Sequence, residues 1–353
     1  MKKRIIALVM CVFFVALLAG CGGAADPLQT MTPKDVLKKS FELSSAQETS
    51  KFKITLSTQV NKLESSDPQA ATMKAFLNSL KGSIEGSGDT KGEKAFISAS
   101  LDAIVDNQQK HIDAKIFSDG KQLIVNLPII KEFIPDKSKY RDYYIIDQKA
   151  MNQDPQMQMS GADNMINPQS AQYKALSAYM SQAYVDIIPD TAVTDNGIQQ
   201  ADTADGKVKV RSIDLTLAKA DLAAVITKTI ALYSDPKYIE LYTAYIKSND
   251  KTVTDAKIKE DIAKAKDEMV KFQTDSLPGI QDTSQLTMKI LIDDSFNMIK
   301  NDIVCSIKAA EQGTAMDLVV MIGVEQSDFN KPVNIQFPQL TLQNSANASN
   351  MMN

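Results

Sequence analysis

Alternation of apolar and polar residues is the feature that most constrains the fold of this chain. It is clearest in SKFKITLSTQV, residues 50–60, and in KAFISASLDAIV, residues 94–105. A period of two is typical of amphipathic β-strands with one buried face. Further strands of this kind are predicted at KGSIEGSGD, HIDAKIF, QLIVNL, RDYYIID, GKVKVRSIDLTL, QLTMKILID, FNMIKNDIVCSIK and AMDLVVMIGV. The sequence therefore predicts an antiparallel sheet with one apolar face.

Segments with helical spacing are expected to cover that face. Thr32-Pro33 opens the first, because threonine caps free amide groups and proline fits the first helical position. Others are predicted near residues 170–187, 221–233, 238–246 and 254–273. The apolar stripe of the last one indicates either a core contact or the roof of a cavity. Sheet and helices together give an α+β fold, since an apolar sheet face must be covered.

The N-terminus has the layout of a secretory signal. Three basic residues precede an apolar run over residues 5–19, which is shorter than the roughly 20 residues of a membrane-spanning helix. Leu18-Ala19-Gly20-Cys21 resembles a bacterial lipobox. This resemblance implies that Cys21 carries diacylglycerol and becomes the first residue of the mature chain. Because two acyl chains anchor a protein stably, we expect an extracytoplasmic protein that Cys21 anchors to the cell membrane.

These features give the expected division of the chain. It consists of a signal peptide at 1–20, a lipid-anchored spacer at 21–31, an α+β domain at 32–342 with an insertion at about 148–190, and a polar tail at 343–353.

The start of the insertion is rich in Gln, Asn and Met and shows no periodicity. Its methionines, Met151, Met157, Met159 and Met165, fit two interpretations. Thioethers suit copper(I), but methionines also cover loops that lie on apolar surfaces. We favour the second interpretation and predict no metal site.

The composition excludes several kinds of chemistry. His111 is the single histidine of the chain, so no zinc-protease motif and no Ser-His-Asp or Cys-His arrangement is present. Cys305 lies on the apolar side of an alternating segment and is predicted to be a core thiol. The net charge is −4, and no basic run follows the signal, which argues against nucleic-acid binding. We therefore predict a protein without catalytic residues, cofactor or metal.

Three acidic or glycine-rich segments read as turns. GSGDTKG, residues 86–92, lacks the spacing of a phosphate-binding loop and lies between strands. The segment that contains Asp202, Asp205 and Gly206 begins like a calcium-binding loop but lacks the acidic residues that such a loop has at alternate positions. Asp293-Asp294 falls between two strands, where acidic residues are common.

Three segments carry a resemblance to a family. They are SDGKQLIVNLP (118–128), KYRDYYIID (139–147) and EQSDFNKPVNIQFP (325–338), and they resemble the LolA, LolB and LppX/LprG group of bacterial lipoprotein carriers. The resemblance rests mainly on the Asp-aromatic-small-Lys-Pro-Val stretch at 328–333. It implies a strongly curved antiparallel half-barrel whose concave apolar face is covered by helices, with a pocket for acyl chains. The long insertion and the helices at 219–275 exceed the usual pattern of that group.

The last part of the chain is expected to complete the sheet. Asp328 and Asn330 are turn formers, and Val333, Ile335 and Phe337 alternate toward one face. We predict a short strand at 333–337 that pairs with residues 315–324 and a dispensable polar tail beyond it.

Two functions fit these expectations. The first is a non-catalytic lipoprotein that binds a lipid or another hydrophobic ligand between sheet and helices. The second is a structural or interaction lipoprotein of the cell envelope, whose core is filled by its own helices and whose partner is another envelope protein.

Overall fold

The computed structural model describes residues 27–44, 47–65, 69–89, 94–105, 108–133, 137–147, 170–203, 206–311 and 314–347. Cys21 and the methionine-rich stretch lie outside these residues, so the predictions for the lipobox and for Met151, Met157, Met159 and Met165 keep their status as predictions.

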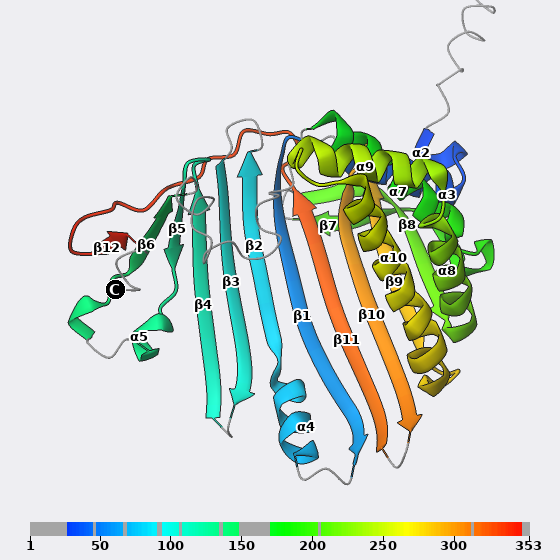
Figure 1. Cartoon of the computed structure of the whole chain (residues 1–353), viewed down its shortest axis with the longest axis horizontal. Helices are drawn as coiled ribbons and strands as arrows, with labels where there is room; N and C mark the ends of the chain where they lie inside the picture. Colours follow the sequence, from blue (N-terminus) through cyan, green and yellow to red (C-terminus); the bar gives the residue numbers. More distant parts are fainter. Residues whose placement is uncertain are drawn as a thin grey trace, which may run out of the picture.

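The described residues form one sheet of twelve strands, ordered β12-β6-β5-β4-β3-β2-β1-β11-β10-β9-β8-β7 (Figure 1). All neighbours are antiparallel except β12 and β6, and the sheet is open. In chain order the strands are β1 (Thr49–Glu64), β2 (Lys81–Asp89), β3 (Lys94–Val105), β4 (Gln108–Ser118), β5 (Gln122–Asn126), β6 (Tyr143–Asp147), β7 (Val193–Thr203), β8 (Gly206–Ala218), β9 (Gln285–Asp293), β10 (Met298–Glu311), β11 (Thr314–Ser327) and β12 (Ser345–Asn347).

Eight α-helices accompany the sheet in the described ranges. They are α2 (Pro27–Thr30), α3 (Pro33–Ser44), α4 (Ala70–Ser79), α5 (Ile130–Phe133), α7 (Ala171–Ile187), α8 (Lys219–Leu232), α9 (Pro236–Asn249) and α10 (Asp255–Lys271). Short 3₁₀ turns occur at Lys137–Lys139, Asp190–Ala192 and Leu277–Gly279, and a π turn at Phe272–Ser276. None of these helices is long and apolar enough to cross a membrane.

The register of the strands separates two faces. The helix face carries Ile54, Ile84 and Ala99, which are paired across β1, β2 and β3. It also carries Ile213 and Ile290, which are paired across β8 and β9, and Ile322 of β11. Alternate residues point to the opposite face, which we call the groove face. It carries Lys53, Glu85, Phe96, Leu291 and Lys300. These strands thus follow the alternation predicted for them.

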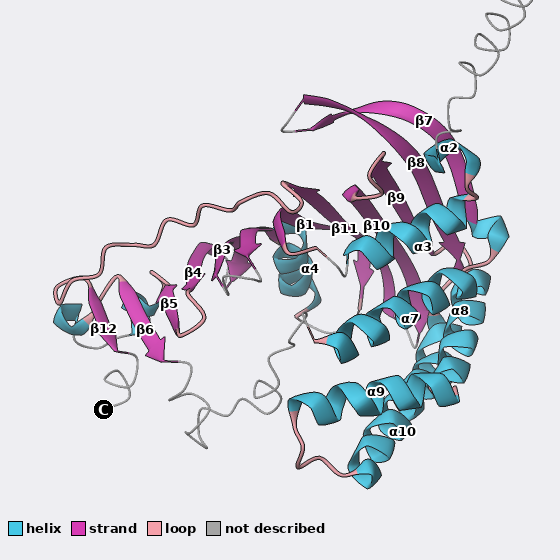
Figure 2. Ribbon diagram, turned by 90° about the horizontal axis from the view of Figure 1, so that it is seen from above, coloured by secondary structure: helices cyan, strands magenta, loops and turns pink. Residues whose placement is uncertain are grey.

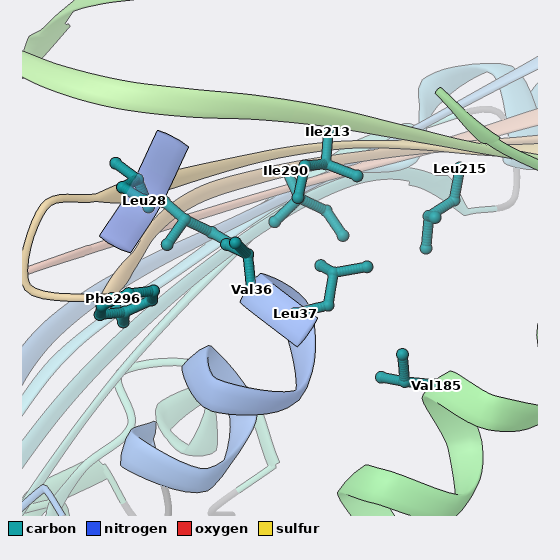
Figure 3. Close-up of a cluster of buried hydrophobic side chains, with 9 residues drawn as sticks. Leu28, Val36, Leu37, Val185, Ile213, Leu215, Ile290 and Phe296 are labelled. Carbon is teal, nitrogen blue, oxygen red and sulfur yellow. The ribbon is translucent and has the colours of Figure 1, made fainter. Parts of the chain in front are cut away.

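The main core lies between the helix face and helices α2, α3 and α7 (Figure 3). Its buried members are Leu28, Val36, Leu37, Val185, Ile213, Leu215, Ile290, Ile292 and Phe296. Thr32 accepts the amide of Asp35 at 3.2 Å, so the predicted cap at the start of α3 is confirmed. This packing places α3 and α7 over β8 and β9.

A buried arginine joins α2 to the last hairpin of the sheet. Arg211 on β8 donates through Nη1 to the carbonyl oxygens of Leu28 and Met31, both at 2.7 Å. Its Nε and Nη2 bind the carboxylate of Asp195 on β7 at 3.1 and 2.6 Å. Arg211 is 5 % exposed, and its buried charge is balanced by the Asp195 carboxylate, while the two carbonyl oxygens accept its remaining hydrogen bonds.

A second helical layer packs on α7 and has a tyrosine-rich core. Tyr238 on α9 is buried against Ile258 and Ile262 of α10, and its ring stacks on Tyr242 at 5.6 Å. Burial raises the pKa of the Tyr238 phenol far above its usual value. The apolar stripe of α10 is therefore a core contact at these two isoleucines, while Phe272 at its end is exposed.

The predicted strands, apart from the one at 333–337, and the five predicted helices are confirmed within a few residues. Asp119 and Gly120 lie in the turn between β4 and β5, where the amide of Asp119 donates to the carbonyl oxygen of Gln122. Helix α4 and strand β7 are additions that the sequence pattern did not predict. Helix α4 covers the ends of β1 and β3, where Val60 and Ala103 are buried.

The predicted covering of the apolar face holds only in part. Helices α3 and α8 contact strands from β7 to β10, and α4 contacts β1 and β3. On the helix face of β2, Ile84 keeps 41 % of its surface exposed. Among the described elements, the helices therefore concentrate over one end of an open sheet (Figure 1).

The prediction for the C-terminal segment is wrong. Residues 333–337 form no strand, because β1 and β10 already occupy both edges of β11. Asp328 and Asn330 do form the turn, both with φ of 54°, a left-handed conformation that Asp and Asn tolerate. Residues 328–344 then cross the groove face as an extended segment, here called the C-terminal strap (Figure 2).

The strap ends in a short strand within the predicted polar tail. Ser345–Asn347 form β12, which pairs in parallel with β6. Residues 345–347 of the predicted tail therefore belong to the sheet, and the residues beyond 347 lie outside the described part of the chain.

Candidate functional site

Two neighbouring cavities lie on the groove face. The first has a volume of about 660 Å³ and the second about 300 Å³. Ser87 and Phe96 line both, so the two cavities meet at β2 and β3. Their sizes fall in the range of small-ligand sites, which is roughly 300–1,000 Å³. We call the pair the groove.

The first cavity lies between the sheet and the end of the β7–β8 hairpin. In Figure 2 this hairpin reaches out over the groove face, on the side of the sheet turned away from α7–α10. Residues 201–203 of β7 form one wall, and Leu291 and Ile299 belong to the opposite one. Leu291 and Ile299 pack with Val210, Ala201 and Phe329 in a small buried cluster. This end of the groove is therefore apolar at its base.

The second cavity lies between the sheet and the strap. Phe96, Lys115 and Phe117 line it from the strands, and residues 334–336 line it from the strap. The rings of Phe96 and Phe117 are 5.0 Å apart, and Phe337 of the strap adds a third ring 6.1 Å from Phe117. Two aromatic side chains on an otherwise polar sheet face thus supply an apolar floor here too.

Ion pairs surround the first cavity. Lys53 lies 3.1 Å from Glu85, and Lys300 lies 3.5 Å from both Asp302 and Glu325.

Lys51 binds Asp328 at the start of the strap at 2.8 Å. Hydrogen bonds from Lys51 and then Lys331 hold the pKa of the Asp328 carboxyl below its usual value. The lysines of the first cavity are thereby matched by carboxylates.

Lys115 differs from these lysines. It lines the second cavity, is exposed, and forms no ion pair within the described part of the chain. The second cavity therefore combines aromatic rings with one uncompensated positive charge.

The predicted pocket between sheet and helices is filled where the helices meet β8 and β9. Leu28, Leu37 and Val185 are each at most 1 % exposed there. Both cavities described above lie instead on the opposite face. Comparison with models of protein families and with curated proteins finds no match for this chain.

Cys305 lies on the helix face of β10, opposite Val320. It is free and half-buried, and burial raises the pKa of its thiol. It therefore fits the predicted core position, with more exposure than expected. Within the described residues, no group of three or more His, Cys, Asp or Glu side chains is arranged to hold a metal ion.

Two of the three segments predicted as turns lie at hairpins between strands, whereas residues 86–89 of the glycine-rich segment belong to β2 and residues 90–92 lie outside the described residues. Thr203 and Gly206 flank the β7–β8 turn, and Gly206 has a φ of 107°. In the β9–β10 turn, the Asp293 carboxylate accepts the amides of Ser295 and Asn297. These residues therefore serve the two hairpins.

His111 is exposed on β4, outside the groove, and its titration gives a prediction. Hydrogen bonds to Asp102 at 2.7 Å and to Asp113 at 3.0 Å raise its pKa above 6.5. Because the folded pKa exceeds the unfolded one, this contribution to stability is complete below the unfolded pKa. It is lost as the pH rises through the folded pKa.

An NMR titration of the single histidine is expected to give a midpoint above 6.5. Asp102→Asn lowers this midpoint, whereas Asp119→Asn, in the β4–β5 turn, leaves it in place. A parent midpoint at or below the ordinary value for histidine contradicts the two hydrogen bonds.

Proposed function

We propose that this chain is a non-catalytic lipoprotein, anchored by Cys21 at the extracytoplasmic face of the cell membrane, that binds a hydrophobic ligand. The observation that supports binding is the groove, whose two cavities share Phe96 and have apolar floors. The lipobox sequence supports the anchor. The ligand site proposed here is on the groove face, which differs from the site expected from the sequence.

A distant relation to the LolA and LppX/LprG carriers is part of the proposal. The large, mostly antiparallel sheet with helices on one face is compatible with it. The open edges and the twelve strands of the described sheet, together with the strap, set this chain apart from the half-barrel that the resemblance implies.

The anchor is tested by labelling cells with radioactive palmitate. We expect label on the parent and on Cys305→Ser, and no label on Cys21→Ala, which remains as unprocessed precursor or is lost to the medium. Label retained by Cys21→Ala contradicts the lipobox.

Ligand binding is tested on protein extracted from the membrane, by native mass spectrometry. We expect a population with a bound hydrophobic molecule in addition to the covalent anchor. After delipidation, the mature chain with Cys21→Ser is expected to take up a fluorescent fatty acid. A protein that is always isolated empty and takes up no probe contradicts the function.

A second candidate is an interaction lipoprotein of the cell envelope. The filled interface between α3, α7 and the sheet favours it, because that part of the protein leaves no room for a ligand. Specific co-purification of one envelope protein with a consistently empty groove would support this candidate over the first.

A further inference from the structure

The C-terminal strap is fixed at both ends but not in its middle. At its start, the Asn330 amide donates to the carbonyl oxygen of Thr49 at 2.9 Å, and Lys51 pairs with Asp328. At its end, Asn344 accepts the amide of Tyr143 through its carbonyl oxygen, and β12 follows.

Between these ends the strap rests on side chains. In the described part of the chain, no hydrogen bond joins residues 332–338 to the sheet. Pro332 and Pro338 have no amide to donate. Phe337 on Phe117 is the ring contact that holds this stretch down. A molecule can therefore lie under the strap without breaking backbone hydrogen bonds.

The two ends of the groove differ in charge. Lys115, without an ion pair among the described residues, lies at the strap end. Asp202 belongs to the wall at the hairpin end, and the lysines nearby are matched by carboxylates. An anionic group is thus favoured beneath the strap and disfavoured under the hairpin.

We infer, on the basis of the proposed function, that the groove binds one linear anionic amphiphile. Its carboxylate or phosphate pairs with Lys115 beneath the strap. Its aliphatic chain passes the junction at Ser87 and Phe96 and ends against Leu291 and Ile299.

The charge of the ligand is tested with hexadecanoate, hexadecyl phosphate and hexadecanol on the delipidated mature chain with Cys21→Ser. We expect both anions to bind more tightly than the alcohol, by about three- to fivefold for one exposed ion pair. Lys115→Gln removes this difference, and Lys121→Gln, a matched change in the β4–β5 turn, preserves it. The stronger of the two anions identifies the head group. Equal affinities for anion and alcohol in the parent overturn the assignment of Lys115.

The path of the chain is tested by closing the junction. Ser87→Phe places a ring where the two cavities meet, and Ser83→Phe places the same ring on the same face and strand outside them. We expect Ser87→Phe to weaken the affinity for hexadecanoate at least tenfold more than Ser83→Phe does. Octanoate is expected to bind the two variants with the same affinity. Thermal unfolding of each variant shows whether it is folded.

The outcomes separate this inference from the proposed function. If hexadecanol and both anions all fail to bind the parent, the proposed function fails. If the chains bind but Ser87→Phe and Ser83→Phe behave alike, the ligand binds elsewhere and the path through the groove is wrong.

Discussion

Replacing Leu37 by alanine is expected to lower the free energy of unfolding by about 2–5 kcal/mol. Leu37 is 0 % exposed and lies in the cluster that joins α3 to β8 and β9. Removing its side chain leaves a cavity between helix and sheet that rigid strands cannot close. Urea unfolding of the parent and the variant measures the difference.

The control for this prediction is Leu342→Ala. Leu342 in the strap is 95 % exposed, so the same deletion removes almost no buried surface. Its effect is expected to stay within about 0.5 kcal/mol. If the two substitutions destabilise equally, the packing of α3 on the sheet is wrong.

Arg211→Leu is expected to destabilise the protein by about 3–5 kcal/mol. The substitution keeps much of the apolar volume but leaves two carbonyl oxygens and the Asp195 carboxylate without their donor. Loss of these bonds also frees α2 from the β7–β8 hairpin. Urea unfolding again gives the magnitude, and Lys237→Gln, which removes an exposed ion pair with Glu240, is expected to cost about 1 kcal/mol or less.

Arg211→Leu is also expected to change how the free energy of unfolding depends on pH. Hydrogen bonds from Arg211 lower the pKa of Asp195 in the folded state. The resulting stability is present above the unfolded pKa of this carboxyl and is lost as the pH falls through the folded pKa. We expect the parent to lose this contribution in acid and Arg211→Leu to lack it. If the free energies of unfolding of the parent and of Arg211→Leu fall in parallel as the pH is lowered, the ion pair between Arg211 and Asp195 is contradicted.

The sequence predicted the strands and helices because each depends on a local pattern. Alternation in residues 50–60 and 94–105 corresponds to β1 and β3, and the helical spacing of 170–187 corresponds to α7. Strand β7 was missed because VTDNGIQQADT is polar on both sides, as an edge strand can be. Helix α4 lies between two strong strand patterns and has no buried residue of its own.

Strand pairing was harder to predict than strand location. Residues 333–337 have a strand pattern, but pairing needs a free edge, and β1 had already taken the edge of β11. The partner of β11 is β1, at the other end of the chain, so no local sequence pattern predicts this pairing.

The groove could have been suspected from two residues. Phe96 and Phe117 are paired with each other on the polar side of their strands, the side that also carries the pair Ser98 and Lys115. An aromatic side chain in a polar row indicates that something covers it. The cover, Phe337, comes from the strap, and the other walls come from β7, β9, β10 and β11. Only the fold brings these elements together.

The pairing of β1 with β11 also determines when the protein can fold. Lys51 lies opposite Ser327, so this seam joins the beginning of the domain to its end. During synthesis, β1 is made long before its partner β11, so the edge of β1 that pairs with β11 stays unpaired until β11 follows. Contacts between residues so distant in sequence slow the search for the native state. A chaperone that shields this edge in the nascent chain would therefore protect the one step on which assembly of the whole sheet depends.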